Sequence, residues 1–217
     1  MRVLPILFNT DMVRAILDGR KTVTRRLPSK RIENKWDDYC DYVSAVATTG
    51  CTSFTEKQFY EQYPPYQPGD ILYVRETWWK NGNTYFYKAG CSKGLIDNMY
   101  VKWRPSIHMP KEAARIWLKV TDVRVERLQD ITEIQTEEEG FFFKPPCLHL
   151  VSQDAYCDLD GPCSSPIKYC DMGFGELFGM ELWDSTIKKS DLDRYGWDAN
   201  PWVLVIEFKR CEKPEEK

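Results

Sequence analysis

ARIWLKVTDVRVERL, residues 114–128, is the stretch of sequence that decides the fold. Apolar and polar residues alternate along it, as they do in a β-strand that buries one of its faces. The alternation slips by one position at Thr121–Asp122, which predicts a β-bulge or a bend there. The chain therefore contains a long, half-buried strand with one irregularity near its middle.

Other β segments lie on both sides of this strand in the sequence. ILYVRETW at 71–78 follows a cluster of turn residues, and WVLVIEF at 202–208 is apolar enough to be a buried final strand. Asn81–Gly82 separates 78–79 from 84–87, which is the signature of a β-hairpin. The β content of the chain is therefore predicted to be high.

Two short helices are predicted beside these strands. Residues 9–11 supply caps for the apolar run 12–17, and Gly19 then ends that helix in the left-handed conformation. A second helix begins at Thr132, its cap, and runs to 139–140. Strands and short helices without a βαβ rhythm or a repeat favour an α+β fold, a small and partly closed β-barrel flanked by short helices.

The 217 residues are predicted to form a single domain, since 42% of them are hydrophobic and can fill a core. Two segments, at about 30–65 and 144–180, break the pattern. The first is rich in Tyr, Thr and charge, and the second holds Pro, Gly and four cysteines. Because neither shows a regular period, we expect both to be irregular loop insertions in the domain.

Hydropathy and cysteine content indicate the compartment. No apolar run approaches the roughly 18 residues of a membrane span, and the first eight residues lack the features of a signal peptide. We therefore expect a cytoplasmic protein without a membrane partner, whose eight cysteines stay reduced. Free thiols are favoured over a bound zinc, since the close ligand pair of zinc sites is missing among Cys147, Cys157, Cys163 and Cys170. No metal or cofactor is predicted.

Charge is unevenly distributed along the chain. The net charge of −3 argues against a protein that binds polyanions with its whole surface. Between Met1 and Lys35, however, nine basic residues face only three acidic ones. This excess indicates either one anionic partner at one site or a solvated basic surface, and charge alone favours neither.

The segment Gly19–Arg26, GRKTVTRR, is predicted to hold the working site, because residues that follow a tight turn are held accurately. Lys21 and Thr24 lie three positions apart, so they alternate faces of an extended chain unless a bend brings them together. A threonine hydroxyl becomes a nucleophile when a base removes its proton, and a lysine is such a base when burial or positive charge lowers its pKa. Positive charge is supplied in the sequence by Arg20, Arg25 and Arg26.

Seven segments, scattered over nearly the whole chain, carry a resemblance to a known family. They are PILFNT at 5–10, ILDGRKTVTRR at 16–26, PGDILYVRETW at 68–78, WRPSIHMP at 103–110, residues 120–133, LWDS at 182–185 and YGWDANPW at 195–202. Together and in this order they resemble the ASCH domain family of the PUA-like superfamily, in its phage and prophage branch. The resemblance implies a small β-barrel with helices packed across its openings.

One branch of that family, the bacterial acetylcytidine amidohydrolases, looks similar around the predicted site. These enzymes remove an acyl group from the exocyclic amine of cytidine, and their pattern has a Lys-x-x-Thr pair and a Glu in the helix after the long strand. The resemblance implies that Lys21, Thr24 and Glu139 are catalytic, with Glu138 competing for the place of Glu139. The carboxylate would position the substrate or shuttle a proton.

Two other interpretations of the same residues stay open. In a binding role without catalysis, the basic and hydroxyl side chains contact phosphates and sugars, while Trp78, Trp79, Tyr85 and Tyr87 stack on bases. In a structural role, Arg25 and Arg26 pair with Glu76 or Glu126, and the tryptophans fill the core. The predicted ligand-binding residues are Arg20, Thr22, Arg25, Arg26, Glu76, Trp78 and His108.

The sequence as a whole favours an ASCH-type protein that recognises RNA or a modified nucleoside. Hydrolysis of an acyl amide on a nucleobase is the activity that the resemblance implies. The alternative is a non-catalytic, phage-encoded module for nucleic-acid binding or protein interaction. Convergence of Lys21, Thr24 and Glu139 within hydrogen-bond reach in a cleft would favour the enzyme.

Overall fold

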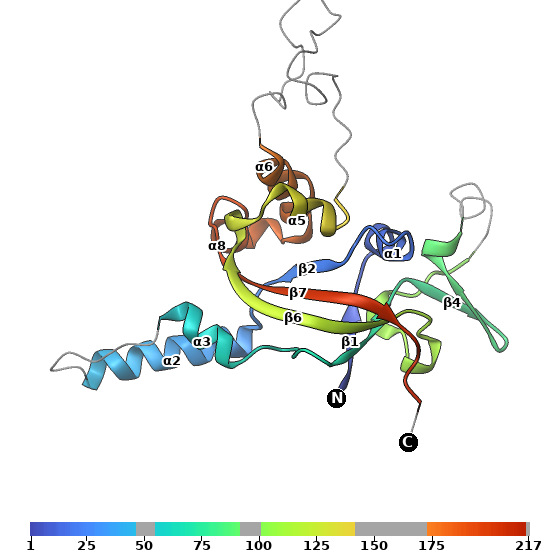
Figure 1. The fold of residues 1–217 in the computed structure, drawn as a ribbon, viewed down its shortest axis with the longest axis horizontal. Helices are drawn as coiled ribbons and strands as arrows, with labels where there is room; N and C mark the ends of the chain where they lie inside the picture. Colours follow the sequence, from blue (N-terminus) through green and yellow to red (C-terminus); the bar gives the residue numbers. More distant parts are fainter. Residues whose placement is uncertain (47–54, 92–100, 142–172, 216–217) are drawn as a thin grey trace, which may run out of the picture.

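A computed structural model describes residues 1–46, 55–91, 101–141 and 173–215. Its centre is a five-stranded sheet in the order β1(Val3–Leu7), β3(Ile71–Arg75), β6(Trp117–Arg127), β7(Trp202–Cys211), β2(Val23–Arg26). β1 and β3 are parallel, and the other neighbours are antiparallel. The long strands β6 and β7 curve through the middle of the molecule (Figure 1). The predicted α+β class is confirmed.

The strand that decides the fold has the predicted irregularity. The register between β6 and β7 shifts between Val120 and Asp122, which confirms a β-bulge at the slip in the alternation. The described sheet ends in two edge strands, β1 and β2, whose backbones do not pair. The Arg26 guanidinium spans this gap, since its Nη2 donates to the Leu7 carbonyl at 2.6 Å. The predicted barrel therefore stays a prediction.

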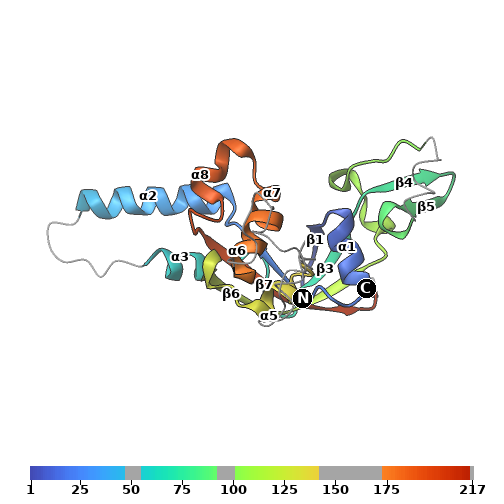
Figure 2. The same ribbon diagram turned by 90° about the horizontal axis from the view of Figure 1, so that it is seen from above.

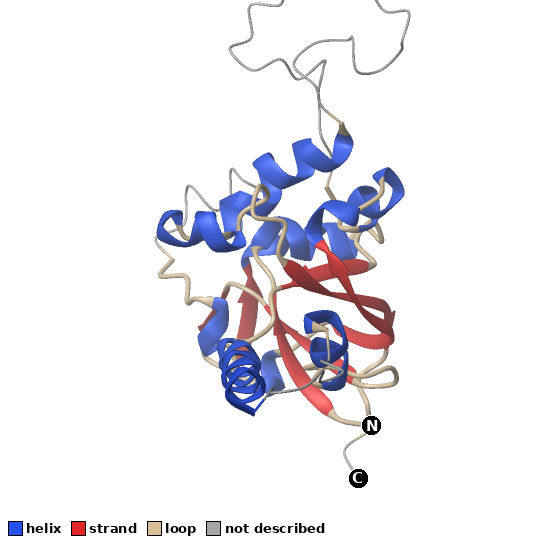
Figure 3. Cartoon of the chain, turned by 90° about the vertical axis from the view of Figure 1, so that its left-hand side faces the viewer, coloured by secondary structure: helices blue, strands red, loops and turns tan. Residues whose placement is uncertain are grey.

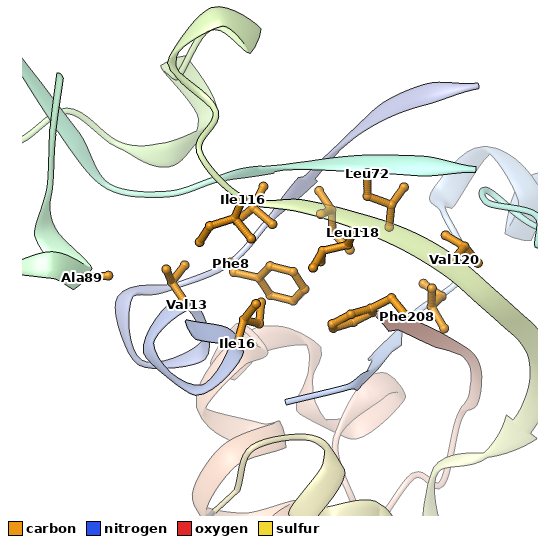
Figure 4. Packing of buried hydrophobic residues seen from close by; sticks show 12 residues of the cluster. Phe8, Val13, Ile16, Leu72, Ala89, Ile116, Leu118, Val120 and Phe208 are labelled. Carbon is orange, nitrogen blue, oxygen red and sulfur yellow. The ribbon is translucent and has the colours of Figure 1, made fainter. Parts of the chain in front are cut away.

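The main core lies between the sheet and α1(Thr10–Leu17). Asn9 caps this helix by accepting from the Met12 N–H at 2.8 Å, and Gly19 follows the helix with φ +77°, as predicted. Val13 and Ile16 point from α1 toward Phe8 and the strand residues (Figure 4). Burial of this apolar face fixes α1, and hence the start of the segment after Gly19, against the sheet.

Residues 30–65 correct the expectation of an irregular insertion, because they contain two helices. These are α2(Lys30–Val46) and α3(Glu56–Gln62), which lie together at one end of the molecule (Figure 1, Figure 2). Ile32, Trp36 and Tyr39 recur at helical spacing and pack on a cluster around Phe59. This apolar stripe is narrow and mostly aromatic on an otherwise charged helix, which is why its period is hard to read from the sequence.

Helices also cover the upper side of β6 and β7 (Figure 1, Figure 3). They are α5(Glu133–Glu138), α6(Phe174–Phe178), the π-helix η7(Gly179–Trp183), α7(Asp184–Thr186), η8(Lys189–Asp191) and α8(Leu192–Tyr195). Thr132 caps α5 with a full capping box, which confirms its predicted start. β7 buries both faces here, since Val203 and Val205 contact this side while Leu204 contacts the α2–α3 side.

The second predicted insertion, 144–180, needs a correction at its end. Residues 174–180 are helical, and Leu177 and Phe178 of α6 are buried in the core. Cys147, Cys157, Cys163 and Cys170 lie outside the described residues. Among the described residues, Cys40, Cys91 and Cys211 are free thiols.

The remaining strands lie at the end opposite α2 (Figure 2). β4(Trp78–Asn81) and β5(Thr84–Tyr87) form the predicted hairpin, with Gly82 at φ +55° in its turn. Short 3-10 turns follow or connect other elements: η1(Lys88–Gly90), η2(Ser106–His108), η3(Lys111–Ala113) and η4(Leu128–Asp130). No helix in the described ranges is both long and apolar enough to cross a membrane.

The packing of the main core predicts the cost of removing one of its side chains. Leu118 on β6 is fully buried, so Leu118→Ala should lower the free energy of unfolding by about 2–5 kcal/mol through lost burial and a cavity. Urea denaturation measures this change. Ile134→Ala on the exposed face of α5 is the matched control and should cost far less. Equal losses in the two variants would contradict the described core.

Candidate functional site

The segment after α1 is held by backbone hydrogen bonds on both sides. The Arg20 and Lys21 N–H groups both donate to the Ala15 carbonyl, at 2.9 and 3.1 Å, and so close the turn at Gly19. The Thr22 N–H donates to the Glu138 carbonyl at 2.8 Å, and the Thr22 carbonyl accepts from the Phe208 N–H at 2.9 Å. The chain therefore runs between the end of α5 and β7 before β2 begins.

A buried ion pair joins this segment to the end of α5. Lys21 Nζ lies 2.5 Å from Glu139 Oε2 and donates to the Glu139 carbonyl at 2.8 Å. The side chain of Lys21 has no exposed surface, and that of Glu139 is 4% exposed. Lys21 Nζ also lies 5.7 Å from the ring centroid of Phe8. An ion pair this deep makes each partner depend on the other, because either charge alone would be costly to bury.

Arg25 is a second buried cation in the same cluster. Its Nη1 lies 3.3 Å from Glu139 Oε1, and its Nη2 donates to Gln135 Oε1 at 2.7 Å. Glu126 of β6 lies 3.6 Å from Nη2, which matches the structural pairing considered from the sequence. Arg25 Nε and Glu126 Oε2 are buried without a hydrogen-bond partner. The cluster thus has two cations around one shared carboxylate, and two of its buried polar atoms could still form hydrogen bonds.

Burial has the largest effect on the pKa values of the buried cations in this cluster. Burial lowers the pKa of Lys21, and the Glu139 carboxylate opposes this change through its charge and its hydrogen bond. The positive charges of Arg26 and Arg25 lower the Lys21 pKa further. Burial also lowers the pKa values of Arg25 and Arg26. Lys21 is therefore shifted in the direction that a lysine base requires.

A small cavity of about 50 Å³ opens beside the ion cluster. Thr24 and Glu139 both line it, and the hydroxyl of Thr24 makes no hydrogen bond to a described residue. The remaining wall comes from Met12, Arg25, Arg26, Phe178, Leu182, Trp183 and Thr186. Lys21 does not line the cavity and reaches it only through Glu139. Since one water molecule occupies about 30 Å³ of liquid, the cavity has room for water but not for a nucleobase.

The cavity wall includes an unusual helix. Leu182 and Trp183 belong to the π-helix η7. A π-helix is rare in proteins overall, but the π-helices that do occur are often found at functional sites. Gly179 begins this helix under Trp197, where a Cβ would lie 2.1 Å from the indole ring. Sequence reasoning did not identify η7, because the extra residue of a π-turn leaves no mark in composition or period.

Gly140 allows the close approach of Lys21 to α5. It has φ +77°, and a Cβ there would lie 2.7 Å from Ala15 Cβ and 3.0 Å from Lys21 Cβ. A side chain would therefore force α1 and the Lys21 backbone away from the end of α5. Glu139 precedes this glycine and makes the contact with Lys21, whereas Glu138 lines a different and more open cavity.

The predicted site residues are divided between several places. Arg20 and Thr22 are exposed and line the open cavity, of about 520 Å³, together with Glu138. Arg20 donates to the Gly140 carbonyl at 3.3 Å. Arg26 lines the small cavity and stands 5.2 Å from the Phe8 ring centroid. The structure therefore brings Thr24, Arg25, Arg26 and Glu139 together, with Lys21 directly behind Glu139.

Glu76, Trp78 and His108 are not brought to this cavity. Glu76 is completely buried and forms a two-point ion pair with Arg115, at 2.9 and 3.0 Å, rather than with Arg25 or Arg26. Trp78 packs in a buried cluster with Met109 and Ala113, so its ring is core and not a stacking surface. His108 is exposed on η2.

Gln135 is the site residue that sequence reasoning did not place beside Arg25, whereas Glu126 was already considered as a partner of Arg25 or Arg26. Gln135 could have been noticed as the third residue after the Thr132 cap, since its side chain also completes the capping box. Glu126 stands on the polar face of the long strand, where an acidic residue is expected in any case. No group of metal-ligating side chains occurs in the described part of the chain.

Comparisons with known proteins give little guidance. No protein-family model and no curated protein matches the chain. The crystal structure of hypothetical protein PH0355 matches over 97% of this chain and 100% of that chain, at 11% identity and a TM-score of 0.39. A likeness at this level carries no argument about function, so any functional interpretation depends on the residues of the site itself.

The close approach at Gly140 predicts a difference between two glycine substitutions. Gly140→Ala should destabilise the protein by about 1–3 kcal/mol more than Gly19→Ala, because only the first adds a clash to the backbone strain. Gly19 has the same φ of +77° with nothing within 4 Å, which makes it the matched control. Thermal and urea denaturation of both variants measure the difference. Equal stabilities would contradict the described packing.

The lowered pKa of Lys21 predicts how stability depends on pH. In the interval between that lowered pKa and its ordinary value of 10.5, the unfolded chain keeps the Lys21 proton that the folded chain releases. The unfolded state then binds more protons, so the free energy of unfolding should rise with pH relative to Lys21→Met. Denaturant titrations across this interval test the sign. A difference that stays constant or falls would contradict a lowered pKa.

Proposed function

We propose that this chain is an ASCH-type, PUA-like protein that acts on a modified nucleoside, and that Lys21, Thr24 and Glu139 form its hydrolytic site. The observation that carries the proposal is the buried Lys21–Glu139 ion pair at 2.5 Å, next to a cavity lined by Thr24. A barrel-like closure of the curved sheet, with helices over its opening, belongs to the same proposal.

The chemistry follows from the roles that these groups can play. Burial favours the neutral form of Lys21, and in that form its amine accepts the proton of the Thr24 hydroxyl by way of the Glu139 carboxylate. Thr24 Oγ attacks the acyl carbon, and the amine of the nucleobase leaves with a proton returned from Glu139. Water then hydrolyses the acyl-threonine ester and restores the hydroxyl. Arg25 stabilises the carboxylate throughout, since its Nη1 lies 3.3 Å from Glu139 Oε1.

The size of the cavity sets a condition on this proposal. About 50 Å³ is too small for a nucleobase, so the substrate must displace part of the wall formed by Leu182, Trp183 and Thr186. The π-helix and the short α7 are the elements of this wall, and short irregular helices are less costly to move than the sheet. Opening of this wall is therefore part of the proposed catalytic cycle.

A second candidate, a module that binds nucleic acid without catalysis, is favoured by a different observation. Lys21 already donates to two oxygens of Glu139 and faces the Phe8 ring, which suits a structural ion pair. In that case the buried cluster only fixes the exposed Arg20 and Thr22 at the rim of the open cavity. A hydrolysis assay decides between the two candidates.

Release of cytidine from N4-acetylcytidine tests the proposal. The purified protein should release free cytidine, and Thr24→Ala should lower the rate by at least about 100-fold through loss of the nucleophile. Chromatography of the nucleosides measures the rate. Thr84→Ala on the exposed hairpin is the matched control and should keep the wild-type rate. Equal rates for Thr24→Ala and the wild type would end the hydrolytic proposal, and no hydrolysis by the wild type would favour the binding module.

A further inference from the structure

A second concave site lies away from the ion cluster, where residues of α2, α3 and the segment after α3 line a groove. Its volume is about 410 Å³, several times that of the cavity beside Thr24. We call it the α2–α3 groove. Its floor includes Ile32 and Leu204, and its walls include Pro28, Pro64 and Pro65. Proline fixes φ, so these walls are stiff and the groove keeps its shape without a ligand.

The groove is basic and lacks acidic residues. Arg2, Arg31 and Lys35 line it, and none of its described lining residues is Asp or Glu. Arg2 is already neutralised, since its Nε donates to both carboxylate oxygens of Asp70 at 3.2 and 3.1 Å. Arg31 and Lys35 form no ion pair with a described residue. Two cations without an ion-pair partner among the described residues therefore line one groove, in a chain of net charge −3.

The positions of these two cations are unfavourable for the helix itself. Arg31 and Lys35 are four residues apart on α2, so they stand on the same face and repel each other. Arg31 also lies in the first turn, where the helix dipole disfavours positive charge. Glu33, the acidic residue of that turn, faces elsewhere, because its carboxylate accepts from the Tyr195 hydroxyl at 2.8 Å. An anionic ligand bound in the groove would reduce both the repulsion between the two cations and the unfavourable interaction of Arg31 with the helix dipole.

Tyr63 holds one of the cations in place. Lys35 Nζ lies 4.8 Å from the Tyr63 ring centroid, at the edge of the groove. The ring in turn packs against Phe59, with 5.1 Å between the centroids. A cation–π contact of this kind restrains a flexible lysine while leaving its ammonium hydrogens free for another partner. Tyr63 is therefore a positioning residue for Lys35.

We infer that the α2–α3 groove binds the phosphodiester backbone of a single-stranded nucleic acid. Repeated phosphates match two exposed cations along one helix face, and a stiff concave groove admits a single strand. The choice of nucleic acid over another polyanion rests on the proposed function, because that function already implies a nucleoside in the substrate. Contacts through phosphates carry no sequence information, so the groove supplies affinity and register rather than base recognition.

Fluorescence anisotropy with a fluorescein-labelled decauridylate tests the inference. Arg31→Ala combined with Lys35→Ala should weaken binding about tenfold, and the slope of log affinity against log salt should fall by about 0.7 for each cation removed. The matched control is Lys57→Ala combined with Lys189→Ala, which removes the same charge from exposed positions outside the groove. This control should bind as the wild type does.

Variants of Tyr63 test the inference without changing the charge of the groove. Tyr63→Ala should weaken decauridylate binding, whereas Tyr63→Phe should restore it, because a phenyl ring retains the contact with Lys35. Circular dichroism confirms that each variant is folded before binding is measured. Loss of binding in both Tyr63 variants would contradict the positioning role.

Three outcomes would overturn the inference as a whole. They are no binding of decauridylate by the wild type, equal losses in the groove variant and the charge-matched control, and equally tight binding of a duplex of the same length. Failure here is distinct from failure of the hydrolytic proposal, because N4-acetylcytidine carries no phosphate and its hydrolysis is measured separately.

Discussion

The buried contact between Lys21 and Glu139 is the interaction on which the rest of the site depends. It joins the segment after α1 to the last turn of α5, two elements separated by more than a hundred residues in sequence. Neither charge could be buried alone without a large penalty, so the pair fixes where both elements lie. Arg25 adds a second cation to the same carboxylate, and the polar cluster thereby determines the shape of the cavity beside Thr24.

In the proposed hydrolytic site, stability and chemistry are coupled through the same cluster. A lysine that is buried deeply enough to have a lowered pKa is also one whose charged form strains the folded state. The Glu139 carboxylate relieves that strain and lines the same cavity as Thr24. Ionisable groups whose burial conflicts with their charge gather at functional sites more often than elsewhere, which is the general reason for proposing this cluster as the working site.

Much of the fold could be predicted from the sequence because local signals agreed with the tertiary structure. The alternation in 114–128 gave both the strand and its bulge at Thr121–Asp122, and Thr132 marked the start of α5. The helices α2 and α3 were missed, since three aromatic or apolar residues on a charged helix give a weak period. Glu139 followed from resemblance, but its contact with Lys21 is a long-range pairing that no local pattern contains.

The assignment of Trp78, Glu76 and His108 shows a different limit. Their segments are well marked in the sequence, but the direction of a side chain at a strand end depends on what packs against it. Trp78 is covered by Met109 and Ala113, and Glu76 by Arg115, so two of the three are internal. Residue type alone could not decide between a core and a site, because an aromatic ring serves in either and a carboxylate serves in a buried ion pair as well as in a site.

The two unpaired margins of the sheet have a consequence for how the protein behaves at high concentration. Exposed strand edges can recruit strands from other chains and so promote aggregation. Here both margins are short, with five residues in β1 and four in β2. The guanidinium of Arg26 occupies the carbonyl of Leu7 at the end of the first margin. Self-association through these edges is thereby opposed by the short length of both edges and by an acceptor that is already used.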